Sequence, residues 1–348
     1  MSNRNYEITK PGPLLDKTGH PVEAGWARKI IKTYDRATIK APKFRIKEWD
    51  YYLVISNKEQ TGFAFTVSDD GYIGLQSVSL LDFSDVSEHT ETVLNAFPLG
   101  KLRMPSDSSS GDVVYKDKRL DLEYLLSPGE RRIFCNFENF KDGKPFKCDI
   151  RLSQPDADTM VIVKPWQEKR TAFYYNQKIN CMRASGTVEF DGRTYTLDPE
   201  TDFGTLDWGR GVWTYDNTWY WGSGNGVVNG KPFGFNIGYG FADDSAATEN
   251  IIFYDGKAHK IDEVTFNIPV ENGQKNYTSP WSFTSSDGRF ETEFVPIIDR
   301  SAKIDLKVIV TDQHQVFGRM SGKAVLDDGT VLEFKDLLCF AEDVHNKY

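Results

Sequence analysis

The sequence predicts an all-β fold with two antiparallel β-barrels in tandem. Asp-Gly and Asn-Gly pairs recur along the chain, and β-rich runs lie between them. Long amphipathic helical patterns are scarce, and the best candidates, residues 24–34 and 245–250, are short. At 348 residues the chain is also too long for one ordinary hydrophobic core. Together these observations favour two β domains over a helical or mixed fold.

The turn dipeptides are the strongest local signal. Asp-Gly and Asn-Gly accept the positive φ angles that tight hairpin turns require. Most of them separate β-rich runs, as in TVEF-DG-RTYTL at residues 187–197. We therefore expect antiparallel hairpins at Asp70-Gly71, Asp142-Gly143, Asp191-Gly192, Asn229-Gly230, Asp255-Gly256, Asn272-Gly273, Asp287-Gly288 and Asp328-Gly329.

A short internal echo supports two similar halves. Residues 183–192, RASGTVEFDG, resemble residues 319–329, RMSGKAVLDDG, apart from one inserted residue. We place the junction at the polar stretch LDPETDFG, residues 197–204. This predicts an N-terminal domain over residues 1–200 and a C-terminal domain over residues 201–348. Each half is long enough to close as a barrel with an internal cavity.

Composition and charge exclude several classes of partner. Hydrophobic residues make up 39% of the chain, charged residues make up 27%, and the formal net charge is -9. Nucleic acids and anionic membranes bind basic faces, so neither is expected as a partner. The chain has no apolar run of about 18 residues, so no membrane span is expected. The composition leaves the oligomeric state open.

The cellular compartment is predicted from the N-terminus and the cysteines. The first residues, MSNRNYEITKPGPLLDKTG, lack the apolar core of a signal peptide. The four cysteines include no CxxC pair, and we expect them to be reduced and buried. Both features predict a cytoplasmic protein.

The stretch TLDWGRGVWTYDNTWYWGSGNG, residues 205–226, concentrates aromatic residues and glycines around one acid and one arginine. Read as a strand, residues 213–221 place Trp213, Asn217, Trp219 and Trp221 on one face, because side chains alternate. The next strand carries Asn236 between glycines, which leaves room for a close approach. Mostly apolar walls with a few polar groups are typical of small-molecule sites. We expect a pocket for a small hydrophobic or flat molecule, with an aromatic barrel core as the alternative.

Asp207 is the main candidate for chemistry, and two environments are open to it. Burial beside Trp208 and Trp213 would disfavour its charged form and raise its pKa, which suits a proton donor. Alternatively, Arg210 folds back and pairs with Asp207, which makes the pair structural.

Further polar residues lie next to aromatic or apolar residues in the sequence and could converge with Asp207 in the fold. Each is by default a satisfied structural hydrogen-bonding group, and Glu342 and His345 near the end of the chain belong with them. The remaining candidates are Tyr174, Tyr175, Asn176, Glu249, Asn250 and His314.

Common cofactor and catalytic motifs are missing from the sequence. GRMSGK at residues 318–323 is one residue short of a phosphate loop, and GSGNGVVNG leads into a hairpin instead of a helix. The five histidines show no metal spacing, and no GxSxG elbow is present. We therefore expect no cofactor and no metal, with any chemistry carried by side chains.

Several separated motifs resemble a bacterial family known as domain of unknown function 2804. They are GTLDWGRGVW, TENIIFYDGKAHKIDEVTF, HQVFG and the closing FAEDVHNKY. A more distant resemblance, over residues 174–209, is to carotenoid 1,2-hydratases and AttH-like proteins. That resemblance implies two lipocalin-like barrels and cofactor-free chemistry on terpenoid or polyketide substrates. In the hydratases an aspartate is thought to protonate an alkene, and Asp207 best matches its motif.

These observations lead to three hypotheses of function. The first is a cofactor-free hydratase, cyclase or isomerase acting on an apolar unsaturated molecule. In it Asp207 is the general acid, Glu249 and His314 assist, and Tyr175, Asn217 or His314 positions the substrate or a water. The aromatic shield of the developing carbocation would be Trp208, Trp213, Trp219 and Trp221. The second is a non-catalytic lipid or pigment carrier. The third is a carbohydrate-active or carbohydrate-binding protein, in which Asp207 and Glu249 would face each other across about 5–10 Å.

Overall fold

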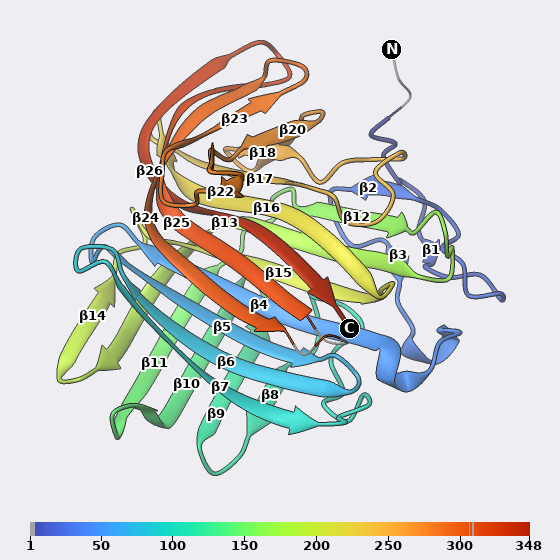
Figure 1. Cartoon of the computed structure of the whole chain (residues 1–348), viewed down its shortest axis with the longest axis horizontal. Coiled ribbons are helices and arrows are strands. Elements are labelled where there is room, and N and C mark those ends of the chain that lie inside the picture. Colours follow the sequence, from blue (N-terminus) through green and yellow to red (C-terminus); the bar gives the residue numbers. More distant parts are fainter. Residues whose placement is uncertain (1–3, 306, 308–309) are drawn as a thin grey trace.

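The computed structural model describes residues 4–305, 307 and 310–348, which form two large antiparallel β-sheets. In Figure 1 strands β24, β25 and β26, coloured orange and red, lie above the blue and cyan strands β4 to β7. The all-β prediction is confirmed. The helical patterns at residues 24–34 and 245–250 do not form helices, because the first contributes the short strands β2 and β3 and the second is a loop.

The first sheet has 13 strands and is built from the N-terminal part of the chain. Its main path runs in the order β7 (Ser87–Ala96), β6 (Ile73–Asp82), β5 (Thr61–Asp69), β4 (Ile46–Ser56), β15 (Phe203–Val212), β13 (Phe173–Phe190), β11 (Lys144–Ser153), β10 (Glu130–Lys141), β9 (Leu120–Ser127) and β8 (Val113–Lys116). Off this path β13 also pairs with β12 (Met160–Pro165) and β14 (Arg193–Leu197), and β12 pairs with β2 (Gly25–Ala27).

The second sheet has nine strands and is built from the C-terminal part. Its order is β19 (Lys257–Lys260), β18 (Ile251–Tyr254), β17 (Lys231–Tyr239), β16 (Asp216–Val228), β26 (Val331–Lys347), β25 (Val310–Val325), β24 (Phe290–Asp305), β23 (Trp281–Ser285) and β20 (Val264–Asn267). Smaller elements are the strand pairs β1 (Gly12–Pro13) with β3 (Lys32–Thr33) and β21 (Val270–Glu271) with β22 (Gln274–Lys275), and the 3₁₀ turns η1 (Arg36–Thr38) and η2 (Lys43–Arg45).

Each expected turn dipeptide lies between two paired strands. In the two-residue turns, such as Asn229-Gly230, both residues have positive φ, as this turn type requires. The internal echo also has a structural counterpart. A Cβ added at Gly186 would come within 2.1 Å of a carbonyl oxygen of the neighbouring strand, and one added at Gly322 would come within 2.3 Å of another. Both copies of the Ser-Gly pair therefore need glycine for the same steric reason.

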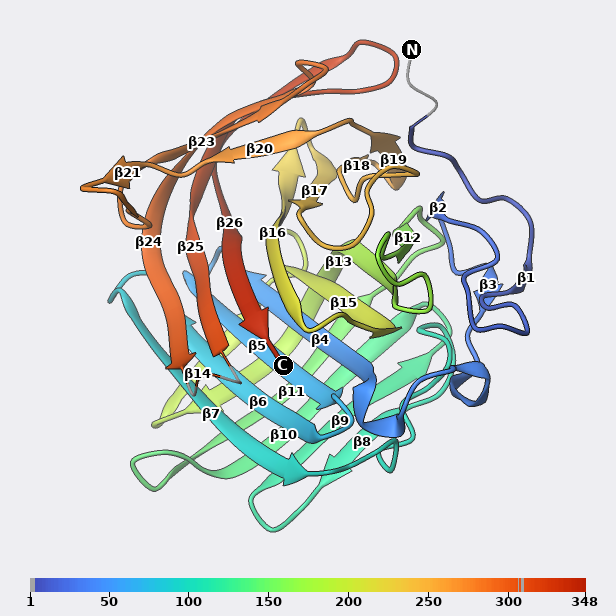
Figure 2. The same ribbon diagram turned by 45° about the vertical axis from the view of Figure 1, so that its right-hand side comes forward.

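Each sheet curls around a hydrophobic core of its own, and the outer faces of the two sheets pack together. Phe63 and Phe146 belong to the first core, and Phe235 and Phe290 to the second. Between the sheets a further cluster joins Tyr51 and its neighbours on the first sheet to Trp221 and its neighbours on the second. Figure 2 shows β16 and β26 passing over β4 and β5.

The change from the first sheet to the second falls inside the aromatic block. Strand β15 pairs with β13 and β4 of the first sheet, and the chain enters the second sheet only at Asp216. The block therefore runs along the contact between the sheets. The division into domains at residues 200 and 201 stays a prediction.

No helix in the described part of the chain is long and apolar enough to cross a membrane.

Candidate functional site

Strand β15 shows how the motif DWGRG divides its residues between two environments. Asp207 lines a cavity between the sheets, and Gly209 lies on the same face because side chains alternate along a strand. Trp208 points the other way into the core of the first sheet, where it packs edge-on against Tyr175 at 5.5 Å between ring centroids. Trp208 and Tyr175 therefore do not face Asp207, although the sequence suggested a common pocket.

Arg210 does not pair with Asp207, contrary to one of the two expectations. Its fully buried guanidinium forms an ion pair with Asp50, with 3.0 Å between Nη1 and Oδ1. It also donates hydrogen bonds to the carbonyl oxygens of Trp49, Pro105 and Gly209. Because Arg210 lies on the core face of β15, it is held by core partners and is out of reach of the opposite face.

The cavity between the sheets has a volume of about 230 Å³. Residues of both sheets line it, and three of the four tryptophans that the sequence placed in the pocket are among them. The aromatic lining residues include Trp49, Tyr174, Trp213, Trp219, Trp221 and Phe241. These rings pack edge-on in several pairs, for example Trp213 and Trp219 at 5.9 Å. The aromatic residues thus enclose a space and do not fill it completely.

Glycine at position 209 makes room for one wall of this cavity. A Cβ added there would come within 1.9 Å of the Trp49 ring. Trp49 in turn lies parallel to Tyr174, with 6.1 Å between ring centroids. The glycine in the motif thus leaves space for the Trp49 ring, which lines the same cavity as Asp207.

Asp207 is held by a lysine and an amide from the neighbouring strand. Lys178, opposite Asp207 in the β13–β15 pairing, places its Nζ 2.8 Å from Oδ1. The side-chain amide of Asn176 donates to the same oxygen. The Lys178 ammonium also lies 3.8 Å from the ring centroid of Trp221 on the second sheet. Lys178 was not identified from the sequence, since only the strand register shows that it faces Asp207.

Glu342 brings a second carboxyl group to the cavity from the last strand, β26. It accepts a hydrogen bond from the Trp219 indole at 2.8 Å and one from the Gln315 amide at 3.0 Å. Burial raises the pKa of Glu342 to about 7, while the Trp219 hydrogen bond and the Lys178 charge oppose the shift. The sequence predicts Glu342 only as one of several polar residues that could converge with Asp207. The available signal was its place directly after the apolar run LLCFA, residues 337–341.

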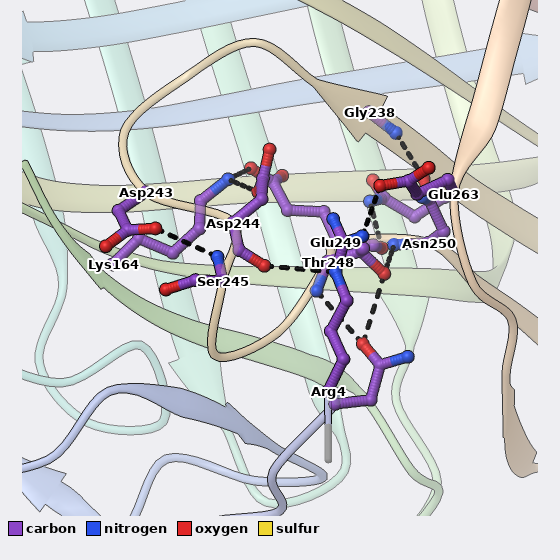
Figure 3. A network of polar contacts seen from close by, with 12 residues as sticks. Arg4, Lys164, Gly238, Asp243, Asp244, Ser245, Thr248, Glu249, Asn250 and Glu263 are labelled. Atoms are coloured by element: carbon purple, nitrogen blue, oxygen red, sulfur yellow. Dashed lines mark hydrogen bonds and ion pairs between the residues drawn. The ribbon is translucent and has the colours of Figure 1, made fainter. Parts of the chain in front are cut away.

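Glu249 also lines the cavity but belongs to a separate polar cluster, drawn in Figure 3. Lys164 of β12 lies between two carboxylates of the loop that joins β17 to β18. Its Nζ is 2.8 Å from Asp244 and 3.0 Å from Glu249. The side chain of Lys164 is fully buried. This cluster ties the loop of the second sheet to the first sheet.

Two asparagines attach this loop to the second sheet. Asn236 accepts the Trp221 indole hydrogen bond at 2.7 Å and donates to the Glu249 carbonyl oxygen. Asn250 accepts from the Gly238 amide and donates to the Asp262 carbonyl oxygen. Both amides are therefore satisfied by the protein itself.

Three other predicted residues lie outside the cavity. The Tyr175 hydroxyl donates to the Lys32 carbonyl oxygen at 2.8 Å inside the first sheet. Asn217 closes a turn by bonding to Thr214. His314 pairs with Asp299 at 2.8 Å and stacks on Tyr277. The structure therefore brings Asp207, Glu249 and Tyr174 to the cavity, together with Asn176 through its bond to Asp207.

No group of three or more His, Cys, Asp or Glu side chains in the described ranges is arranged to hold a metal ion.

The comparison with protein families gives a clear result. Residues 5–348 match the family model described as Domain of unknown function (DUF2804). The chain belongs to this family. The comparison with curated proteins finds no match.

Three solved structures resemble this chain at low sequence identity, and the two with a TM-score of 0.50 or more share its fold. An AttH-like protein from Nitrosomonas europaea has a TM-score of 0.54 and 14% identity, over 95% of this chain and 98% of that one. CghA with Sch210972 has a TM-score of 0.50 and 9% identity, over 87% and 89%. Kievitone hydratase from Nectria haematococca has a TM-score of 0.49 and 11% identity, over 87% and 88%.

Proposed function

We propose that this protein is a cofactor-independent enzyme that protonates a carbon–carbon double bond of a small, apolar, unsaturated molecule. The observation that carries the proposal is Glu342, a buried carboxyl group in an aromatic cavity with a pKa of about 7. A carboxyl group that is largely protonated near neutral pH can act as a general acid. Transfer of that proton to the alkene leaves a carbocation on the substrate. The carbocation would then be quenched by addition of water, by attack of an internal alkene or by loss of another proton.

We assign the proton-donor role to Glu342 and a supporting role to Asp207. The Asp207 carboxylate forms an ion pair with the Lys178 ammonium, with 2.8 Å between Oδ1 and Nζ. A carboxylate held in this way suits stabilisation of a nearby positive charge. Its negative charge also raises the pKa of Glu342, whereas Lys178 lowers it. Asp207 and Lys178 would thus tune the pKa of the donor in opposite directions.

The aromatic walls suit a cationic intermediate. The faces of Trp rings attract cations, and an enclosed apolar site keeps bulk water away from a reactive carbon. Trp219 is bonded to Glu342 through its indole nitrogen and packs against Trp213, so the ring next to the acid has a fixed orientation. The fold shared with CghA, which was solved with Sch210972, further supports a small molecule as the ligand.

Deuterium incorporation tests the proposal without knowledge of the natural substrate. The protein is incubated in D₂O with a panel of isoprenoid and polyketide alkenes, and mass spectrometry follows solvent deuterium bound to carbon. The wild-type protein is expected to label at least one alkene. Glu342→Gln should lower the labelling rate at least about 100-fold while the protein still binds the same alkene.

The matched control is Glu333→Gln, an exposed glutamate on the same strand. It should label at the wild-type rate. Binding of alkenes by the wild-type protein without any deuterium incorporation would refute the catalytic proposal and favour a carrier. Unchanged labelling in Glu342→Gln would refute the assignment of the acid.

A further inference from the structure

Lys47 on β4 is a buried cation in the contact between the sheets. Its residue is only 1% exposed. The Nζ atom lies among three aromatic rings, at 4.1 Å from the centroid of Tyr348, 5.0 Å from Trp213 and 5.1 Å from Tyr72. Within the described residues this Nζ has no hydrogen-bond partner. An ammonium carries three donors, so its hydrogen-bonding capacity is entirely unused.

A second unpaired donor lies beside it. The indole Nε1 of Trp213 is buried and likewise has no acceptor among the residues described. Trp213, Tyr348 and Asp70 all line the cavity, so Lys47 lies directly behind its wall. Buried donors without acceptors cost free energy, and two adjacent ones indicate that an acceptor comes from elsewhere.

The strand register places Lys47 far from the acid end of the cavity. Asp207 pairs with Tyr51 of β4, and Gly211 pairs with Lys47, so both rows point to the same face. Tyr51 and Lys47 are four positions apart on β4, which corresponds to roughly 13 Å along the strand. Trp49 lies between them and lines the cavity. The cavity thus extends from the Asp207 and Glu342 end to Asp70, Trp213 and Tyr348, and Lys47 lies next to the rings at this second end.

Two charged groups, Asp70 and Arg45, act on Lys47. Burial raises the pKa of Asp70, whereas the Lys47 charge and a hydrogen bond donated by Ser68 lower it. Arg45 adds a further positive charge near Lys47. Burial lowers the pKa of Lys47 to about 8, with Arg45 acting in the same direction and Asp70 against it. The amine therefore remains mostly protonated at neutral pH.

We propose that Lys47 and Trp213 form a subsite for the carboxylate of an elongated apolar ligand. The carboxylate oxygens would accept from the Lys47 ammonium and the Trp213 indole, and the apolar body would lie along Trp49 towards Glu342. The ligand class is then a medium-length apolar carboxylic acid. This inference uses the cavity of the proposed function but does not depend on the proton transfer.

Calorimetric titration with decanoic acid and with 1-decanol tests the subsite, because the two probes differ only in the head group. The wild-type protein is expected to bind the acid at least about tenfold more tightly than the alcohol. Lys47→Met should abolish this preference, Trp213→Phe should reduce it, and Lys47→Arg should keep most of it. If Lys47→Met does not fold, the Trp213→Phe and Lys47→Arg variants decide the question.

Glu342→Gln separates this inference from the proposed function. It should keep the preference for decanoic acid even though it loses deuterium incorporation. Equal binding of acid and alcohol by the wild-type protein, or binding of neither, would overturn the subsite. An undiminished preference in Lys47→Met would do the same.

Discussion

Two buried lysines of the first sheet meet carboxyl groups in different ways. Lys164 on β12 contacts two carboxylates, Asp244 and Glu249, at 2.8 and 3.0 Å. Among the described residues, Lys178 on β13 forms an ion pair with a single carboxyl group, that of Asp207 at 2.8 Å, and it also faces the ring of Trp221. Both amines are almost completely inaccessible to solvent. At Lys164 both nearby carboxyl groups have the ammonium within bonding distance. At Lys178 only Asp207 does among the described residues, and the carboxyl group of Glu342, in the same cavity, has no ion pair there.

This difference separates a structural contact from a site suited to chemistry. Burial lowers the pKa of Lys164, but the charges of Glu249 and Asp244 outweigh it and the pKa ends above the usual value. In the Lys164 cluster both carboxyl groups therefore have an ammonium within bonding distance. At the other site Glu342 accepts hydrogen bonds from Trp219 and Gln315 and has no ion pair with any residue that the structure describes, and burial raises its pKa to about 7. Glu342 is therefore a buried acid that can change its protonation state near neutral pH.

Removal of the Lys164 ammonium should have the largest effect on stability. Lys164→Met leaves Asp244 and Glu249 close together at the contact between the sheets, without their shared cation. We expect the free energy of unfolding to fall by about 3–5 kcal/mol, as for other broken buried ion pairs. Urea denaturation followed by tryptophan fluorescence measures this.

The control for that experiment is Lys169→Met, in which an exposed lysine shortly after β12 is replaced. Its stability should stay within about 0.5 kcal/mol of the wild type. A loss below about 1 kcal/mol in Lys164→Met would show that the cluster is not the tie between the sheets that its geometry indicates.

Titration of Glu342 should make stability depend on pH. Its folded pKa of about 7 lies above the ordinary value of 4.5, so the neutral acid is favoured in the folded state. The resulting stabilisation is complete below pH 4.5 and is lost as pH rises through about 7. Over that range the stability of the wild type relative to Glu342→Gln should fall by up to about 3 kcal/mol.

Urea denaturation of both proteins at several pH values checks this result. The difference in free energy of unfolding should change between pH 4.5 and 7 and then level off. A difference that is constant across this range would mean that Glu342 titrates like an exposed glutamate, and the contrast with the Lys164 cluster would disappear.

The sequence predicted the local features of the fold better than the long-range ones. The hairpin turns follow from single dipeptides such as Asn229-Gly230, because two residues determine the turn. Strand alternation also places Asp207 and Trp208 on opposite faces of their strand, and it does the same for Tyr174 and Tyr175. One residue of each pair could therefore have been assigned to the core. The sequence alone did not indicate which residue of each pair faces a cavity.

The acid end of the cavity depends on contacts that no local pattern encodes. Asp207 meets Lys178 because of the register of β13 with β15, which shifts between Ile179 and Met182. Glu342 arrives from the other sheet, in a strand far away in the chain. Arg210 is a different case. Residues 207 and 210 are three positions apart, so strand alternation places them on opposite faces, and the expected ion pair could have been excluded from the sequence.

Replacement of Lys178 gives the smallest expected loss of stability and the sharpest test of the comparison. In Lys178→Met, Asp207 keeps the hydrogen bond from Asn176 and lines the cavity, where its side chain is 11% exposed. We therefore expect a loss of about 1–3 kcal/mol, below that of Lys164→Met.

Because the Lys178 charge lowers the pKa of Glu342, its removal should move that pKa upward. The pH-dependent loss of stability, and of deuterium incorporation, should then move to higher pH than in the wild type. An unchanged pH profile would show that Lys178 and Glu342 do not interact, and the two lysines would then differ only in the number of their ion pairs.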